Sequence, residues 1–226
     1  MAQSRIPEVT VHRLPIYLRA VEAMRRQGVQ TVSSQEIARV TGFSSEQIRK
    51  DLAYFGAFGV RGVGYETEHL AWAIASILGL TEPVPVALVG VGHLGSALVR
   101  HNATQPTPMR IRLLFDADPQ KVGQEVGGLP IRPVRTLPDA LRKEGVDVAI
   151  VAVPPESAQA VTDLLVTGGV RAILNFAAVT VRVPPQVYVQ NVDLNLALET
   201  LAYYRHHAAV PGGPALLATQ EMDGGK

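Results

Sequence analysis

Apolar residues recur at helical spacing near the start of the chain. Leu14, Leu18, Val21 and Met24 follow one another at intervals of three or four positions, and Gly28 comes after them. Residues at these intervals lie on one face of a helix, and a glycine just beyond the last of them commonly marks the helix end. The pattern predicts a first helix that buries one apolar stripe and stops at Gly28.

A short second helix is predicted from its capping residues. Ser33 stands three residues before Glu36, a spacing that lets each side chain bond to the backbone N–H group of the other residue. We expect Ile37 and Val40 to face inward from this helix, and Gly42 to end it.

A third helix opens in the same way, with Ser44 three residues before Gln47, and is predicted to continue through Phe55. Helix, short helix, glycine-containing turn and helix is the arrangement of a helix-turn-helix. The glycine-rich run of residues 56–65 then predicts a wing of two short strands, and residues 68–78 predict a further helix. Residues 1–80 are therefore expected to form a winged-helix DNA-binding domain.

From residue 84 onward, short apolar runs alternate with helical stretches, which is typical of a parallel α/β sheet. The predicted strands are residues 84–89, 111–115, 147–153 and 171–174. We expect a doubly wound Rossmann domain over residues 81–192, one more helix over residues 193–207 and a disordered tail over residues 208–226.

The composition narrows the class of protein. Of 226 residues, 47% are hydrophobic, but no run approaches the roughly 20 apolar residues of a membrane span. We expect no secretory signal, since residues 1–10 lack an apolar segment. The absence of cysteine excludes disulfides, thiolate catalysis and cysteine-ligated metals, and fits a cytoplasmic protein. Scattered histidines give little support for a metal site, and a net charge of +1 does not by itself indicate a nucleic-acid binder.

One face of the third predicted helix carries the candidate DNA contacts. At about 100° per residue, Ile48, Leu52 and Phe55 share a buried stripe, and Lys50 points in the opposite direction. Donors on such a face suit base edges and phosphates in a major groove, while a basic wing tip suits a narrow minor groove. The alternative is an ordinary solvated helix face. For Tyr54, a place in the core is an equal alternative. The candidate DNA-binding residues are Ser45, Gln47, Arg49, Lys50, Tyr54 and, at the wing tip, Arg61.

A glycine-rich turn follows the first predicted strand of the sheet. Gly90, Gly92 and Gly95 form G-x-G-x-x-G between that strand and a helix. In a dinucleotide site the first glycine permits the tight turn, the second lets the backbone approach a pyrophosphate, and the third allows close packing of helix on strand. Asp116 ends the second strand, where a carboxylate binds ribose hydroxyls and repels a 2′-phosphate. The site is therefore expected to prefer NAD(H) to NADP(H).

Further candidates follow the later strands, because ligands of doubly wound sheets lie beyond the carboxyl ends of the strands. Hydride-transfer enzymes also need an acid or base beside the reacting carbon, and the stretch between Pro154 and Asn191 contains no histidine or lysine. Binding of the cofactor without turnover is the simpler interpretation. The candidate nucleotide-binding residues are Gly90, Val91, Gly92, His93, Leu94, Gly95, Asp116, Val153, Pro154, Asn175 and Phe176.

Two other classes of protein stay open at this point. One is an NAD-dependent dehydrogenase with an accessory domain in residues 1–80, which turnover of a small alcohol or hydroxy acid would support. The other is an interaction module that binds CoA or another nucleotide, which binding of CoA without binding of NADH would support.

Together these residues resemble the Rex family of bacterial redox-sensing transcriptional repressors, over about residues 7–204. The resemblance rests on many short motifs in order, which are Arg13-Leu-Pro-x-Tyr17-Leu-Arg19, Ser33-Ser34, Ile48-Arg49-Lys50-Asp51-Leu52, Tyr54-Phe55-Gly56, Arg61-Gly-Val-Gly-Tyr65, Ile77-Leu-Gly-Leu80, the glycine turn, Leu174-Asn-Phe-Ala177 and Asn191-Val-Asp-Leu194.

The resemblance implies a homodimer in which the C-terminal helix swaps onto the partner's Rossmann domain. It implies binding to an inverted-repeat operator in double-stranded DNA, release by NADH, and competition between NAD+ and NADH. By the same resemblance, Arg49 and Lys50 contact the major groove and Arg61 enters the minor groove. Arg19 and Asp193 resemble the family's switching pair.

The chain also departs from common family patterns at His93, His101, Ala178 and Leu194. His101 stands where some members have a tyrosine that competes for the switching aspartate. Leu194 stands where some members place a phenylalanine near the nicotinamide, which adds it to the candidate nucleotide-binding residues. These replacements concern the details of the trigger, whereas the architecture implied by the resemblance is unaffected.

Overall fold

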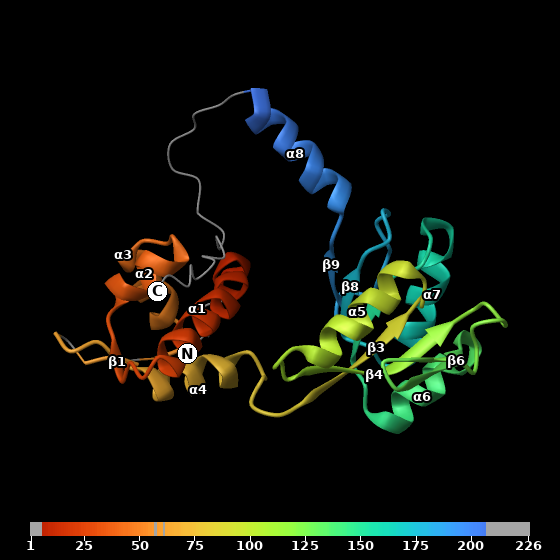
Figure 1. Ribbon diagram of the computed structural model, residues 1–226, viewed down its shortest axis with the longest axis horizontal. Coiled ribbons are helices and arrows are strands. Elements are labelled where there is room, and N and C mark those ends of the chain that lie inside the picture. The colour runs from red at the N-terminus through yellow and green to blue at the C-terminus, as the bar shows by residue number, and fades with distance from the viewer. Residues whose placement is uncertain (1–5, 57, 61, 207–226) are drawn as a thin grey trace, which may run out of the picture. The chain divides into compact units, whose positions relative to one another are not determined.

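The computed structural model describes residues 6–56, 58–60 and 62–206, and the chain divides into two compact units whose boundary in the sequence falls between Thr81 and Glu82 (Figure 1). Each unit has its own hydrophobic core. Within the described ranges, the helices lack the combination of length and apolar character that a membrane crossing requires.

The first unit is helical with a small antiparallel ribbon. The stripe predicted on the first helix is confirmed, because Leu14, Leu18 and Val21 are buried and Met24 packs against the same core. The elements of this unit are α1 (Glu8–Arg26), β1 (Thr31–Val32), α2 (Ser34–Thr41), α3 (Ser45–Ala53), β2 (Tyr65–Glu66) and α4 (Thr67–Ile77).

The capping box that opens α2 is confirmed. Ser33 Oγ accepts from the N–H group of Glu36 at 3.2 Å, and the Glu36 carboxylate accepts from the Ser33 N–H at 2.7 Å. Ile37 is fully buried as expected, but the inward placement of Val40 is wrong, because Val40 is 50% exposed. Thr41 takes the inward position instead, and its buried hydroxyl donates to the Ile37 carbonyl oxygen, so no polar group is left unpaired there.

α3 differs from the prediction at both ends. Ser44 caps the helix by accepting from the Gln47 N–H at 3.1 Å, but the Gln47 side chain turns to Asp51 rather than back to the cap, so only half of the box forms. The helix ends at Ala53 and not at Phe55, because the next two N–H groups bond three residues back and tighten the last turn.

The second unit is built on a seven-stranded sheet with the order β5-β6-β4-β3-β7-β8-β9, in which β5 is an antiparallel edge strand and the others are parallel. Without the edge strand this is the 3-2-1-4-5-6 order of a Rossmann sheet, as predicted. The elements are β3 (Val84–Val89), α5 (His93–Thr104), β4 (Met109–Asp116), β5 (Glu125–Val126), β6 (Leu129–Pro133), η1 (Val134–Thr136), α6 (Leu137–Glu144), β7 (Val148–Val151), α7 (Pro155–Thr167), β8 (Ala172–Asn175), β9 (Tyr188–Asn191) and α8 (Leu194–His206).

β7 is shorter than the predicted strand over residues 147–153. Its last ladder pair joins Val151 to its neighbours, and the chain turns out of the sheet at Ala152, beside the backbone of Gly90. Pro154, which has no N–H group to continue a ladder, then starts the next helix as its N-cap.

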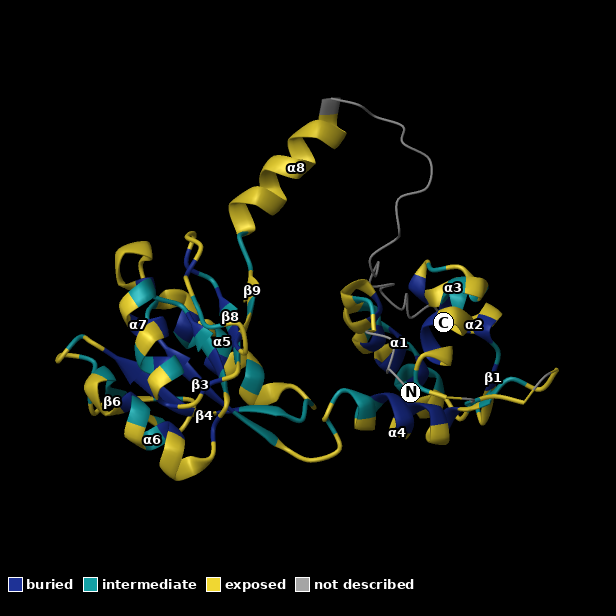
Figure 2. Cartoon of the chain, turned by 180° about the vertical axis from the view of Figure 1, so that it is seen from behind, coloured by how far each residue is buried: buried dark blue, intermediate teal, exposed yellow. Residues whose placement is uncertain are grey.

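Alternate residues of the central strands are buried on opposite faces of the sheet, as expected when helices cover both faces. Ala87 and Val89 of β3 pack into one cluster, and Val86 and Leu88 pack into the other. α8 behaves differently. All of its described side chains are exposed in the single chain, leucines and tyrosines included (Figure 2).

Candidate functional site

Three glycines shape the turn between β3 and α5, and two of them leave no room for a side chain. Gly90 has a φ of +97°, and a Cβ added to it would collide with the Ala152 carbonyl oxygen. A Cβ on Gly95 would collide with the Gly90 carbonyl oxygen, so this glycine lets α5 lie against the strand. Around Gly92, in contrast, no described atom other than those of the glycine and its two chain neighbours lies within 4 Å of an added Cβ. This open space lies at the N-terminus of α5, where backbone N–H groups and the helix dipole favour an anion.

Asp116 holds this turn from the neighbouring strand. Its Oδ2 accepts from the Val91 N–H at 2.8 Å and from Lys121 Nζ at 3.1 Å, and its Oδ1 accepts from the Asp118 N–H at 2.9 Å. Burial opposes the charge, but the hydrogen bonds outweigh it and hold the pKa of this carboxyl below its ordinary value of 3.8. The N–H group of Val91, a residue that the sequence placed in the nucleotide site, is therefore committed to Asp116.

The carboxyl ends of three strands meet at the edge of the sheet where this turn lies. Val89 of β3 is in register with Val151 of β7, which is in register with Asn175 of β8. The residues that follow these ends include the glycine turn, Val153, Pro154 and Phe176, so the structure brings these candidates together. β4 lies on one side of β3 and β7 on the other, which is the point where ligands bind in sheets of this kind.

Asn175, one of the predicted nucleotide contacts, is engaged in hydrogen bonds within its own unit. It is fully buried, and its amide group donates to the Val179 carbonyl oxygen at 2.9 Å and to Asn191 Oδ1 at 2.8 Å. Its own Oδ1 accepts from the Ala177 N–H at 3.0 Å. The side chain thus ties β8 to β9 and shapes the loop that carries the half-buried Phe176.

The candidate reading face lies on α3. Ile48 and Leu52 are buried, as predicted, and Lys50 is exposed. Tyr54 follows the helix and is 37% exposed, which disfavours the alternative that places it in the core. Ser45, at the start of the helix, is half-buried.

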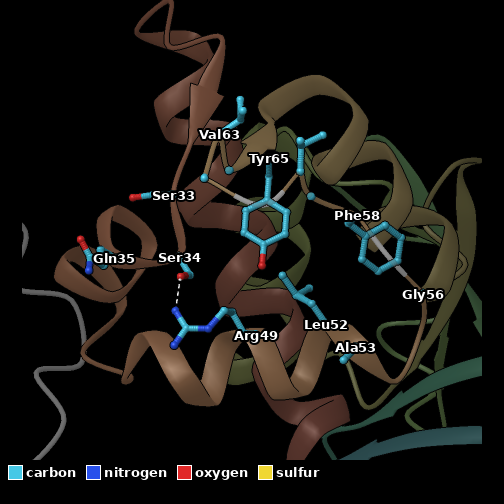
Figure 3. A pocket seen from close by; sticks show the side chains of 14 residues that line it. Ser33, Ser34, Gln35, Arg49, Leu52, Ala53, Gly56, Phe58, Val63 and Tyr65 are labelled. Atoms are coloured by element: carbon cyan, nitrogen blue, oxygen red, sulfur yellow. Dashed lines mark hydrogen bonds between the residues drawn. The ribbon is translucent and has the colours of Figure 1, made fainter.

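A cleft of about 660 Å³ lies between the start of α2, α3 and the wing (Figure 3). Arg49 donates from α3 to Ser34 Oγ at 2.9 Å, and Tyr65 points from the other side toward Arg49 and Leu52 (Figure 3). Gln47 is held by Asp51 at 2.9 Å. Arg49 and Gln47, two of the predicted DNA contacts, are therefore held by bonds within the unit, whereas Lys50 is exposed on the helix surface.

The wing of two short strands predicted over residues 56–65 forms only in part among the described residues, as one isolated bridge and one strand that pairs with residues 31–32. Val32 and Tyr65 pair across β1 and β2, and Val60 bridges to Gly64. Gly64 has a φ of +104°, and an added Cβ would lie 2.6 Å from the Val32 carbonyl oxygen, so the turn requires glycine. Arg61, the predicted minor-groove contact, lies outside the described residues.

A buried carboxylate that was not among the predicted site residues joins α3 to α1. Asp51 is 1% exposed and accepts from Arg13 Nε at 2.6 Å, Arg13 Nη2 at 2.8 Å, the Tyr17 hydroxyl at 2.8 Å, the Thr10 hydroxyl at 3.1 Å and the Gln47 amide at 2.9 Å. The signal available in the sequence was the spacing of Thr10, Arg13 and Tyr17, three polar residues on the buried face of a helix.

The candidate switching residues belong to different units, and each is described within its own. Arg19 is exposed on α1 and lines a mostly apolar groove of about 760 Å³, to which Val40 and Phe43 also contribute. Asp193 precedes α8, and its Oδ1 accepts from the second and third N–H groups that follow it, at 2.9 and 3.3 Å. His101 and Leu194 are exposed. Among the described side chains, no group of three or more histidines, aspartates or glutamates is arranged to hold a metal ion.

Two family models match the chain. One, described as "CoA binding domain", matches residues 81–179, and the other, described as "Putative DNA-binding protein N-terminus", matches residues 5–53. The first match falls almost wholly in the second unit, and the other falls in the first unit.

Curated relatives cover most of the chain. The "Redox-sensing transcriptional repressor Rex" of Streptomyces coelicolor is 43% identical over 204 residues, which are 90% of this chain and 79% of the relative. The protein of the same name from Pelotomaculum thermopropionicum is 45% identical over 203 residues, 90% of this chain and 95% of the relative.

Solved structures of RSP, a Rex-family repressor, have the same architecture. RSP in complex with β-NAD+ and operator DNA matches with a TM-score of 0.85 and 31% identity, over 90% of this chain and 94% of that one. RSP in complex with β-NADH matches with a TM-score of 0.79 and 29% identity, over 90% of this chain and 96% of that one.

Proposed function

Because the chain belongs to the Rex family of redox-sensing transcriptional repressors, we propose that it binds an inverted-repeat operator as a homodimer and leaves it when NADH fills its nucleotide crevice. The observation that carries this proposal is the presence in one chain of a Rossmann glycine turn and of a winged-helix unit whose α3 exposes Arg49 and Lys50. The proposal places this activity in the cytoplasm, where operator DNA and NADH are both present.

The edge of the sheet at the glycine turn would suit a dinucleotide. The open space beside Gly92 would admit the pyrophosphate, with the first N–H groups of α5, those of His93 and Leu94, directed at it. Asp116 would meet the adenosine ribose with the acceptor capacity left beyond its bonds to the turn, and Phe176 would border the nicotinamide together with Val153 and Pro154.

The residues proposed to border the nicotinamide would also favour the reduced cofactor. Val153, Pro154 and Phe176 carry no charge, and burying an uncompensated cation against such a surface is costly. Oxidised nicotinamide is cationic, whereas the reduced ring is neutral. We therefore expect tighter binding of NADH than of NAD+, and equal affinities measured by calorimetry would contradict this account.

The switch has a defined energetic requirement. A ligand moves an equilibrium between two states only by its differential affinity for them. Moving a population from 1:99 to 99:1 takes about 5.5 kcal/mol, so two crevices in a dimer would each need to supply roughly half of that. The recognition helices must match half-sites roughly 34 Å or a multiple of that apart, so a rigid-body change between protomers would suffice to release the duplex.

α8 supplies the surface for a dimer. Its leucines are about 60% exposed in the single chain, which would be unfavourable unless another surface covers them. We propose that α8 packs onto a second copy, and that Arg19 of one copy pairs with Asp193 of the other in the DNA-binding state. His101 and Leu194 would then influence how NADH binding changes this pairing.

The decisive experiment is a gel shift on an inverted-repeat duplex, titrated separately with NADH, NAD+ and CoA. We expect NADH to release the duplex at lower concentration than NAD+. Release by CoA but not by NADH would favour the CoA-binding alternative. The match of residues 81–179 to the CoA-binding model is the reason for including CoA in the titration. Retention of the duplex at saturating NADH would contradict the proposed function.

Two variants test operator binding and NADH binding separately. Lys50→Ala should weaken operator binding and leave the affinity for NADH unchanged, because Lys50 is exposed on α3, in the unit without the nucleotide turn. Gly92→Ala should do the reverse, because an added methyl group would fill the space proposed for the pyrophosphate.

A further inference from the structure

The carboxylate of Asp51 is saturated by its partners. A carboxylate offers about four lone-pair positions, and Asp51 receives five hydrogen bonds, four of them from α1. Burial opposes the charge, but the bonds from Arg13, Tyr17 and Gln47 outweigh it and lower the pKa of this carboxyl. The group is therefore held ionised and fully occupied, and it faces α1 rather than solvent.

The partners on α1 are themselves firmly placed. The Arg13 side chain is 18% exposed and grips the carboxylate with two nitrogens, a geometry that fixes direction as well as distance. Tyr17 is fully buried, with its ring edge-to-face against Phe43 at 5.7 Å, and the Arg13 guanidinium lies 5.8 Å from the same ring. Asp51 is thus bound to a rigid part of the unit.

The position of Asp51 on α3 gives this bond its significance. α3 has nine residues, and Ile48 and Leu52 anchor it in the apolar core. The bond from Arg49 to Ser34 joins it to α2. Asp51 adds the attachment to α1, and it directly precedes Leu52 and follows Lys50. Since successive residues are about 100° apart, any roll at Asp51 redirects Lys50.

We infer that Asp51 is a positioning residue for DNA recognition, which fastens α3 to α1 so that Arg49 and Lys50 meet the duplex in one orientation. This inference rests on the proposed function and deepens it. Asp51 itself does not contact DNA, because it is buried on the side of the helix that faces α1.

If α3 is held less firmly, the protein should lose sequence specificity before it loses its overall affinity for DNA. Contacts to phosphates tolerate small changes in orientation, whereas bonds to base edges depend on it. Removing the attachment should therefore weaken binding to the operator more than binding to an unrelated duplex. The number of phosphates neutralised should be unchanged, so the salt dependence of unrelated binding should keep its slope.

The test uses the full-length protein and a duplex that the wild type selects from random DNA. Asp51→Asn removes the charge, and Tyr17→Phe removes one donor while keeping the buried ring. The control is Glu144→Gln, which breaks an exposed ion pair with Arg132 in the other unit. Affinities for the selected duplex and for an unrelated one are measured by fluorescence anisotropy over a range of salt concentrations, and circular dichroism and thermal unfolding report the folded fraction.

We expect the ratio of specific to unrelated affinity to fall about three- to tenfold in Tyr17→Phe, the range that loss of one hydrogen bond supports, and further in Asp51→Asn. The control should keep the wild-type ratio. A folded Tyr17→Phe protein with an unchanged ratio would overturn the inference, whether or not its stability is lowered. This outcome is decisive even if Asp51→Asn fails to fold. If the wild type selects no duplex, the proposed function fails first and the inference falls with it.

Discussion

At the scale of single residues, Gly92 and Gly95 separate two requirements that the glycine motif combines. Gly95 is needed for the fold, because the Gly90 carbonyl oxygen occupies the place of its missing side chain. Gly92 lies beside open space and has a φ of −83°, which any residue can adopt. Only a ligand would require a glycine at that position, so the two residues can be tested independently.

Gly95→Ala should lower the free energy of unfolding by about 1–3 kcal/mol, the usual cost of an overpacked contact. Gly92→Ala should leave the thermal midpoint unchanged and weaken NADH binding about tenfold or more, which corresponds to about 1.4 kcal/mol. Thermal unfolding and isothermal calorimetry on both variants provide the comparison. Undiminished NADH affinity in Gly92→Ala would place the pyrophosphate elsewhere.

The same scale shows what the sequence could and could not predict about the site. The glycine turn and Asp116 were predictable, because their spacing is set within one β-α-β unit. The buried role of Asp51 was not, since its partners on α1 lie 34 to 41 residues away and are brought to it only by packing. The structural bonds of Asn175 were not predictable for a similar reason, because its bond to Asn191 forms only when β8 and β9 pair.

At the scale of elements, two sides of α1 make different contacts. One side supplies Thr10, Arg13 and Tyr17 to Asp51, and another lines the groove that contains Arg19. Arg13 belongs to both surfaces. A displacement of α1 by a segment that enters the groove would therefore carry α3 with it, because the attachment between the two helices is made of short, charge-assisted bonds.

The attachment between α1 and α3 should make the first unit sensitive to acid. The folded pKa of Asp51 lies below the ordinary value of 3.8, so its contribution to stability is complete above that value and is lost as the pH falls through the folded pKa. Asp51→Asn should therefore be less stable than the wild type at pH 7 and lose less stability on acidification.

Urea unfolding at several pH values, followed by tryptophan fluorescence, measures this effect. Trp72 is the only tryptophan of the chain and lies on α4, so its emission follows the first unit. Asp116→Asn is the control, since Asp116 also has a lowered pKa but belongs to the other unit. Parallel pH dependences in wild type and Asp51→Asn would show that other groups govern acid unfolding.

At the scale of the whole molecule, the sequence predicted the order of domains and the parallel sheet, because hydrophobic periodicity changes sharply near residue 84. It could not predict the surroundings of α8. Periodicity marks an apolar face on a helix but does not say which surface covers it, and in the single chain Leu194, Leu198 and Leu201 are 59–63% exposed.

The proposed dimer can be tested through these leucines. Leu194, Leu198 and Leu201 are spaced four and three residues apart and so share one face of α8. The double substitution Leu198→Glu with Leu201→Glu should convert the dimer into a monomer, because buried charges without partners are strongly unfavourable. Sedimentation velocity should show the mass fall by half, with near-unchanged circular dichroism. A persistent dimer would mean that another surface joins the two copies.

Arg19→Ala tests how the two units communicate. If Arg19 pairs with Asp193 of a second copy in the DNA-binding state, the variant should bind NADH with wild-type affinity but show a changed concentration of NADH for release of the duplex. A shift of about fivefold or more is expected for a coupling of about 1 kcal/mol. Normal release in a gel shift would remove Arg19 from the switch.

The bond between Asp116 and the turn also limits how the sensor can be re-engineered. The usual first step toward recognition of NADPH is to exchange the acid at this strand end for a small or basic residue. Here that exchange would also free the Val91 N–H and leave Lys121 without its carboxylate, so the turn would lose its support before any new selectivity was gained. A reporter for the phosphorylated cofactor built on this scaffold would need a substitute anchor for the turn first.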